Sequence, residues 1–539
     1  MNNNPMSMPA SDSILRRLLI RPHLPKLFFV LVCLGTLGAV WASIASRRPA
    51  QPVDKRDAAA PVALAEKAAA EKLIPPPVAD EKNFAAIPLF EGLIEKGLTA
   101  DSSGWPDDYS RAAGWPRQYS SMAASPTGRK TGRLVTDLAA WEKAFLQSQA
   151  HPGKGHDPID VSPDPDPAAN AVAALAVLKS LEPYEPILKE LETASQRPES
   201  RFNVHYDLEN PWATLLPHLA LVKRIVQTLA LKASAEGAAG KPGDALRDAV
   251  LMLRLVQAPS REPTLVSQLV RVAGFQLALQ PVWECLAERR WSEEQLKTAQ
   301  GRLQQIDFIA DLKQVLEAER AWGNLTIGLT RDKRPPQATT ALMGPKSKVA
   351  TWQKEADAAF VSCPRDWFDQ EQRNYNQLFD ERVLAGFDVE ARRFQPRVAE
   401  ANTRFVEANL RDSKNLVQDH FVFAKMLLVE QAKIHMKFAA AQTAVDCAAV
   451  ACALERHRLA AGQFPSTLNE LSPRFLRTLP HDLIDGKPLR YERDGEGGYT
   501  LYSIGWNEAD DNGEPAFLAS GRNTELKDGD WVWRYPARK

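Results

Sequence analysis

"AAAQTAVDCAAVACALERHRLAAGQFPSTLNELSPRFLRTLP", residues 439–480, joins two sequence patterns of different period. Before Gly462, from about Leu416 to Ala461, the chain contains neither Pro nor Gly, which predicts one long helix. Gly462 ends that helix as a C-cap. One apolar stripe follows the helical period, and it comprises Phe423, Leu427, Ile434, Phe438, Ala441, Val445, Ala448 and Cys452.

After Gly462 the pattern becomes that of a small antiparallel sheet. A turn and a short helix come first, with Ser466 as the expected N-cap. Residues 489–492 and 499–502 alternate in polarity on either side of DGEGG, which predicts a β-hairpin. The segment GDWVWRYP (529–536) supplies a further strand, with its two tryptophans on one face.

The middle of the chain, residues 83–415, is predicted to be an α-helical domain. Leu215, Leu219, Val222 and Val226 recur at spacings of four and three residues. A long apolar helix is expected from about Thr264 onward, so these segments are interpreted as antiparallel helix pairs. The fold class is therefore mainly α, with residues 416–539 forming a long helix and an α+β module.

The N-terminus carries a membrane signal. Residues 27–45 include no charge, and nineteen helical residues span about 28 Å, close to the hydrocarbon thickness of a bilayer. We interpret this segment as a single transmembrane helix that anchors the chain in the inner membrane, with residues 1–26 as a cytoplasmic tail. A cleaved secretory signal ending near 43–45 is the alternative. Residues 46–82, rich in Ala and Pro, are expected to be a linker outside the cytoplasm.

Composition excludes some classes of function. The 67 basic and 67 acidic residues give a net charge of zero, which argues against nucleic acid as a partner. The five cysteines show no CxxC spacing and no disulfide framework. No metalloprotease, nucleophile-elbow, phosphate-loop or dinucleotide motif is found, so the chain is predicted not to be an enzyme.

Three segments resemble the C-terminal half of the major pseudopilins of type II secretion systems: GQFP (462–465), LPHDLIDGKPLRY (479–491) and SIG (503–505). The resemblance covers residues 443–514 and implies a helix, a turn and a sheet that ends in an acidic calcium loop. It also suggests partners in a secretion or pilus-like assembly. The membrane segment 27–45 departs from the family because it lacks the GFTLxE motif and its glutamate.

The loop after the hairpin is the candidate metal site. Calcium prefers several carboxylate and carbonyl oxygens. The ligands implied by the resemblance are Glu508, Asp510, Asp511 and Asn512, with backbone carbonyls near Ser503. The alternative is an acidic turn exposed to solvent. Apart from calcium, no cofactor is expected.

An internal repeat is the candidate ligand site. GWPDDYS (104–110) returns ten residues later as GWPRQYS (114–120), which places Trp105 with Tyr109 and Trp115 with Tyr119. Such aromatic pairs can clamp a cell-wall glycan, or they can pin an irregular loop onto the helical body.

We therefore expect a membrane-anchored, non-enzymatic envelope protein that acts as a scaffold or interaction partner. Other envelope or secretion-system proteins are the expected partners. A glycan-binding envelope module is the second hypothesis. A hydrolase with an active site that follows no known motif is the third.

Overall fold

The computed structural model describes residues 64–95, 135–150, 165–333, 363–405, 407–408, 420–428, 434–494, 497–517 and 524–535. Within these residues the protein is mainly helical with a small antiparallel sheet, which confirms that part of the predicted fold class. The predicted transmembrane helix, residues 27–45, lies outside the described residues.

The described residues form α-helices and a few single-turn helices. The α-helices are α3 (Leu64–Glu71), α4 (Pro88–Glu95), α7 (Leu138–Ala150), α8 (Pro167–Ser180), α9 (Glu185–Ala194), α10 (Pro217–Ala238), α11 (Pro242–Gln257), α12 (Leu265–Ala287), α13 (Glu293–Leu303), α14 (Phe308–Lys333), α17 (Arg365–Leu378), α18 (Pro396–Phe405), α20 (Val422–Leu428) and α21 (His435–Ala461). The single turns are η1 (Asp80–Lys82), η3 (Glu182–Tyr184), η4 (Pro211–Ala213), η5 (Phe379–Val383), η6 (Leu384–Gly386) and η9 (Leu468–Leu471).

The strands are short and antiparallel. They are β1 (Phe387–Asp388), β2 (Arg393–Phe394), β3 (Arg490–Arg493), β4 (Tyr499–Ser503), β5 (Pro515–Phe517), β6 (Thr524–Gly529) and β7 (Trp531–Tyr535). Strands β3, β4 and β7 form one sheet with β4 in the centre, and β1–β2 and β5–β6 form two separate pairs.

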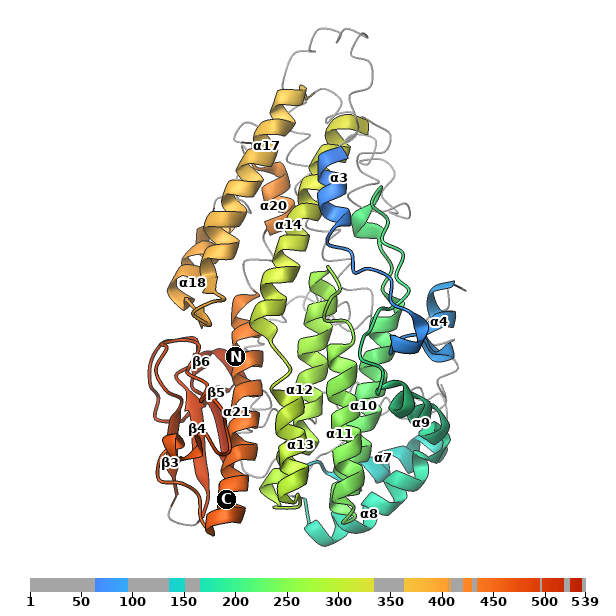
Figure 1. Cartoon of the computed structure of the whole chain (residues 1–539), viewed down its shortest axis with the longest axis vertical. Helices are drawn as coiled ribbons and strands as arrows, with labels where there is room; N and C mark the ends of the chain where they lie inside the picture. The colour runs from blue at the N-terminus through green and yellow to red at the C-terminus, as the bar shows by residue number, and fades with distance from the viewer. Residues whose placement is uncertain are drawn as a thin grey trace, which may run out of the picture.

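Local sequence signals begin several of the central helices. Thr264 caps α12, because its side chain accepts a hydrogen bond from Ser267 N. Ser292 and Gln295 form a capping box at the start of α13. Helices α10, α11 and α12 pack on one another as consecutive neighbours, and Figure 1 shows α10 to α13 running side by side. The predicted helix pairs are therefore present.

Helix α21 lies between the helical body and the sheet, as Figure 1 shows. It packs on α12, α13 and α14 on one side and on β4, β6 and β7 on the other. Its buried side chains are mostly small, among them Ala439, Ala441, Ala448, Ala451, Cys452 and Ala453. Gly462 ends it with φ of 78°, and its N–H donates to Arg458 O, as expected of a C-cap.

Among the described residues, α21 alone is long and apolar enough to cross a membrane. The most apolar part of it is 83% buried inside the protein, so α21 forms part of the core.

The prediction of one helix over residues 416–461 is wrong, because the described residues of this range form two helices, α20 and α21. Tertiary contacts fix the start of α20. His420 adopts φ of 56°, which is incompatible with an α-helix. The buried carboxylate of Glu371 on α17 then accepts hydrogen bonds from Val422 N and Phe423 N, the first free amides of α20.

The sheet follows the sequence prediction. Strands β3 and β4 form the expected hairpin, and β7 adds the expected third strand, with Leu501 opposite Trp533. Trp531 and Trp533 alternate along β7, and both are buried. The N-cap of the short helix η9 is Thr467, one residue later than expected, and the Glu470 carboxylate accepts from the backbone N–H of Thr467.

Residues 64–82 belong to the range expected as a linker, yet they are packed against the helical body. Helix α3 lies on α14, and Ala70 is fully buried. Lys67 Nζ lies 2.8 Å from Glu209 Oε1. Nothing in a composition of Ala, Pro, Lys and Glu reveals this contact, because it depends on a surface that α14 provides.

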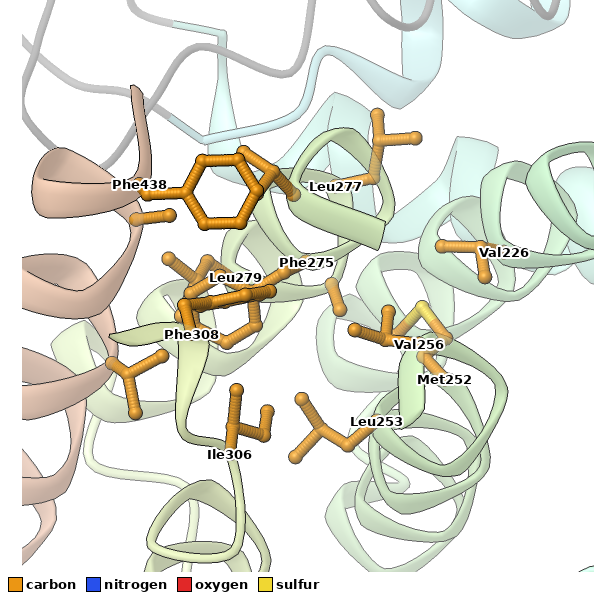
Figure 2. Packing of buried hydrophobic residues seen from close by; sticks show 14 of the residues in the cluster. Val226, Met252, Leu253, Val256, Phe275, Leu277, Leu279, Ile306, Phe308 and Phe438 are labelled. Carbon is orange, nitrogen blue, oxygen red and sulfur yellow. The ribbon is translucent and has the colours of Figure 1, made fainter. Parts of the chain in front are cut away.

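One continuous hydrophobic cluster runs through the described parts of the chain, from Ala70 to Tyr535. Figure 2 shows its centre, where Phe275 of α12, Phe308 of α14 and Phe438 of α21 meet. The rings of Phe275 and Phe308 lie edge to face at 5.6 Å, and those of Phe308 and Phe438 at 6.4 Å. The C-terminal module therefore shares its core with the helical body.

Candidate functional site

The predicted calcium loop follows β4. Its side chains are engaged by other protein groups. Ser503 Oγ is buried and donates to Asp482 Oδ1 at 2.8 Å. Glu508 lies 2.6 Å from Arg397 Nε. Asp510 accepts from the hydroxyl of Tyr502.

The remaining two residues of the loop bond within it. Asp511 accepts a hydrogen bond from Asn507 Nδ2 at 2.9 Å, and Asn512 N donates to Asp510 Oδ1 at 3.1 Å. Within the described parts of the chain, no group of three or more His, Cys, Asp or Glu side chains is placed to hold a metal ion.

Asp482 fixes the start of this loop. Its carboxylate is fully buried and accepts from Ser503 Oγ, from Ile504 N at 3.0 Å and from Arg490 Nη1 at 2.9 Å. It also accepts from Ile484 N, so it joins two turns of the chain around one carboxylate. The sequence analysis did not give Asp482 a role, although the LPHD segment contains it.

Asp530 fixes the other end of the loop. Its buried carboxylate accepts from Asp511 N at 3.2 Å and from Gly513 N at 2.7 Å. Burial raises the pKa of Asp530 to about 6. Gly505 has φ of 68°, and a Cβ there would overlap the carbonyl oxygen of Gly529, so only glycine fits. The loop is thus held by two aspartates outside it.

The candidate glycan clamp lies outside the described residues. Trp105, Tyr109, Trp115 and Tyr119 all fall between residues 96 and 134, which the structure does not describe.

A second candidate site is a cleft of about 450 Å³ on the helical body. It lies between the loop that follows α9, the C-terminal ends of α11 and α13, and the start of α14. Its walls carry four arginines: Arg197, Arg254, Arg261 and Arg302. A cleft of this size is in the range of small-molecule sites.

The acidic residues of the cleft already have basic partners. Asp307 lies 2.6 Å from Arg392, and Asp311 lies 2.8 Å from the fully buried Arg271. Glu199 is 3.9 Å from Arg261. Among the described residues no carboxylate forms an ion pair with the other three arginines of the cleft.

Two of these arginines are held by backbone carbonyls. Arg197 Nη1 donates to Asn83 O at 2.9 Å and to Ala86 O at 2.7 Å. Arg254 Nη2 donates to Glu199 O at 2.7 Å, and its guanidinium lies 4.9 Å from the centre of the Phe84 ring. These contacts fix the side chains in place and leave their charges without a counterion among the residues that the structure describes.

The charge of Arg254 is in an unfavourable environment. Burial, and secondly the charge of Arg302, lower the pKa of Arg254 to about 10. Arg254 therefore stays protonated at neutral pH. The lowered pKa shows that its cationic form is less stable here than in water.

No pattern in the sequence predicts this cleft. Arg254 and Arg302 each lie in the last turn of their helix, which is a common position for a basic residue. That position gives no sign that the two helix ends meet.

The fold and these sites define a mainly helical protein with a buried carboxylate clamp in its sheet and an arginine-lined cleft in its body. No protein-family model, curated protein or solved structure matches the chain.

Proposed function

We propose that the chain is a membrane-anchored, non-enzymatic envelope protein that acts as a scaffold or interaction partner. Residues 27–45 would lie in the inner membrane, and the bulk of the chain would lie outside the cytoplasm. The observation that carries the proposal is that buried polar groups connect segments far apart in the sequence into one body.

Several of these connections join the sheet to the helical body. Trp283 Nε1 on α12 donates to Arg534 O on β7 at 3.0 Å. Gln300 Nε2 on α13 donates to Phe475 O at 2.8 Å, after the short helix η9. Arg456 on α21 pairs with Glu293 on α13 at 2.8 Å. Each fixes the orientation of the C-terminal module relative to the helices.

Another connection joins the segment before α7 to the bundle. Glu284 Oε1 on α12 accepts from both the backbone N and the hydroxyl of Thr136, 148 residues away, at 2.7 Å each. Burial raises the pKa of Glu284, while its hydrogen bonds to Ser234, Gln280 and Thr136 oppose that shift. This carboxylate is therefore used in holding segments together.

A single rigid body suits a protein that presents several surfaces at fixed positions. The partial resemblance of residues 443–514 to major pseudopilins supports a partner in a secretion or pilus-like assembly. Fold likeness alone does not carry function, so the partner has to be found by experiment.

The anchor is tested by fractionation of bacterial membranes that contain the full-length tagged protein. We expect the protein to resist carbonate extraction and to be accessible to protease only from outside the cytoplasm. Leu34→Arg with Val40→Arg, inside the apolar segment, would release it, because a charge at the bilayer centre is costly. Val53→Arg with Ala58→Arg, outside the segment, serves as the matched control. A wild-type protein extracted by carbonate would overturn the anchor.

The scaffold role is tested by cross-linking the same tagged protein in its native membranes, followed by purification. Recovery of envelope proteins that depends on the intact chain supports the role. Retention on isolated peptidoglycan that is lost in Trp105→Ala with Trp115→Ala would favour glycan binding instead. Recovery of neither proteins nor glycan would contradict both proposals.

A further inference from the structure

The arginine-lined cleft carries an inference that does not depend on the membrane anchor. We infer that the cleft binds a small, hydrophilic molecule through a phosphate group, with Arg197, Arg254 and Arg302 as the cationic side of the site.

The cleft carries an excess of positive charge. Three arginines in one cleft have no carboxylate partner among the described residues, whereas its aspartates are neutralised by Arg271 and Arg392. The C-terminal ends of α9, α11 and α13 also reach the cleft and bring negative partial charge, about half an elementary charge each. Three such ends offset only about half of the arginine charge, so the cleft remains positive.

The wall of the cleft is firmly supported from behind. The wall that carries Arg254 is backed by the hydrophobic core, where Leu253 and Val256 of α11 lie in one cluster with Ile306 (Figure 2). Behind it, the fully buried Arg271 donates from Nε to Val256 O at 2.8 Å. Because Arg197 and Arg254 are positioned before binding, these two side chains lose little entropy when a ligand arrives.

The groups that line the cleft suit a phosphate. Guanidinium groups form paired hydrogen bonds with phosphate or carboxylate oxygens. A phosphate carries about two negative charges at neutral pH and offers three acceptor oxygens, which suits three uncompensated cations better than one carboxylate. Ser200 also lines the cleft, and its buried Oγ has no hydrogen-bond partner within the described parts of the chain. The wall is largely polar, which indicates a hydrophilic carrier such as a phosphorylated polyol.

The test is calorimetric titration of the full-length protein in uncharged detergent with pyrophosphate, with glycerol phosphate and with citrate. We expect both phosphate compounds to bind more tightly than citrate. Arg302→Glu removes one cation and adds an anion. The Arg302 side chain is exposed and forms no hydrogen bond or ion pair with the described residues, so the variant is expected to fold. Its affinity for pyrophosphate should fall about tenfold or more, given the usual contribution of a charged hydrogen bond.

Arg477→Glu is the matched control, because Arg477 is an exposed arginine outside the cleft and the change in net charge is identical. It should bind like the wild type. Arg302→Lys should retain part of the affinity. The inference is overturned if neither phosphate compound binds, if both glutamate variants weaken binding equally, or if citrate binds as tightly as pyrophosphate. Binding of glycerol phosphate but not pyrophosphate would support it and point to a phosphorylated polyol or a lipid headgroup.

Discussion

The carboxylate of Asp482 accepts a hydrogen bond from the hydroxyl of Ser503 at 2.8 Å, and both side chains are fully buried. Ser503 is the last residue of β4, where the predicted calcium loop begins. An internal carboxylate therefore orders the start of this loop.

Asp482→Asn is expected to destabilise the protein strongly. The new amide nitrogen would face Ile504 N–H and the Arg490 guanidinium, so donors would oppose donors and Arg490 would lose the fully buried one of its carboxylate partners. The breaking of such a pair costs about 3–5 kcal/mol. Urea denaturation of the full chain measures the change.

Asp485→Asn is the control for Asp482→Asn, because Asp485 pairs with the same Arg490 from a more exposed position. Its effect is expected to be smaller than that of Asp482→Asn, because Asp485 is partly exposed and Arg490 keeps its buried partner. Equal losses in the two variants would show that the buried carboxylate has no special role.

Calcium is expected to leave the melting temperature of the full-length protein unchanged. Glu508 is paired with Arg397, and the backbone between Asp511 and Gly513 is already held by Asp530. A cation that bound only the folded state would raise the melting temperature by mass action. Scanning calorimetry with calcium and with chelator compares the two conditions, and a clear rise with calcium would restore the metal-loop hypothesis.

Gly323→Ala is expected to destabilise the protein by about 1–3 kcal/mol through overpacking. A Cβ at Gly323 on α14 would overlap the hydroxyl and ring of Tyr375, which is fully buried on α17. Gly301→Ala on the exposed face of α13 is the matched control, because a Cβ there meets nothing within 4 Å. That control is expected to stabilise by about 0.5–1 kcal/mol, since alanine favours the helix. If the denaturation midpoints of both variants shifted in the same direction from that of the wild type, the packing argument would be contradicted.

The stability contributed by Glu371 is expected to fall as the pH rises. Burial raises the pKa of Glu371 to about 8 in the folded protein, from an ordinary value of 4.5. The folded state therefore holds a proton that the unfolded state has released, and stability decreases between about pH 5 and about pH 8. Glu371→Gln removes this dependence.

The difference in unfolding free energy between the wild type and Glu371→Gln isolates Glu371, because Glu236 and Asp446, whose pKa values burial also raises, are common to both proteins. We expect the wild type to lose a few kcal/mol relative to the variant over this range. A constant difference would place the Glu371 carboxyl in a more hydrated environment than the structure shows.

Local patterns predicted the elements that local physics determines. The hairpin of β3 and β4, the strand β7, the start of α12 near Thr264 and the end of α21 at Gly462 all follow from residue type and spacing. Each depends on turn residues, alternation or a cap, and these are present in the sequence itself.

Long-range contacts determined what the sequence could not show. The start of α20 at Val422 is marked by no Pro or Gly, and it is stabilised by Glu371, some fifty residues earlier. Asp530 directly precedes Trp531 of β7 in the sequence, yet its carboxylate accepts from Gly513 N, in a loop that lies seventeen residues earlier. The cleft brings together Arg197, Arg254 and Arg302 from three helix ends, and no spacing in the sequence predicts that they meet.

Helix α21 has neighbours on two opposite sides, and this makes the sheet and the helical bundle thermodynamically inseparable. If the sheet unfolds, one side of α21 loses its cover, and the bundle loses the helix that closes its core. We expect one cooperative transition in which fluorescence from Trp531 and Trp533 in β7 and helical circular dichroism change together. A destabilising substitution in the sheet or in the bundle then lowers the stability of both, although no ligand or moving part connects them.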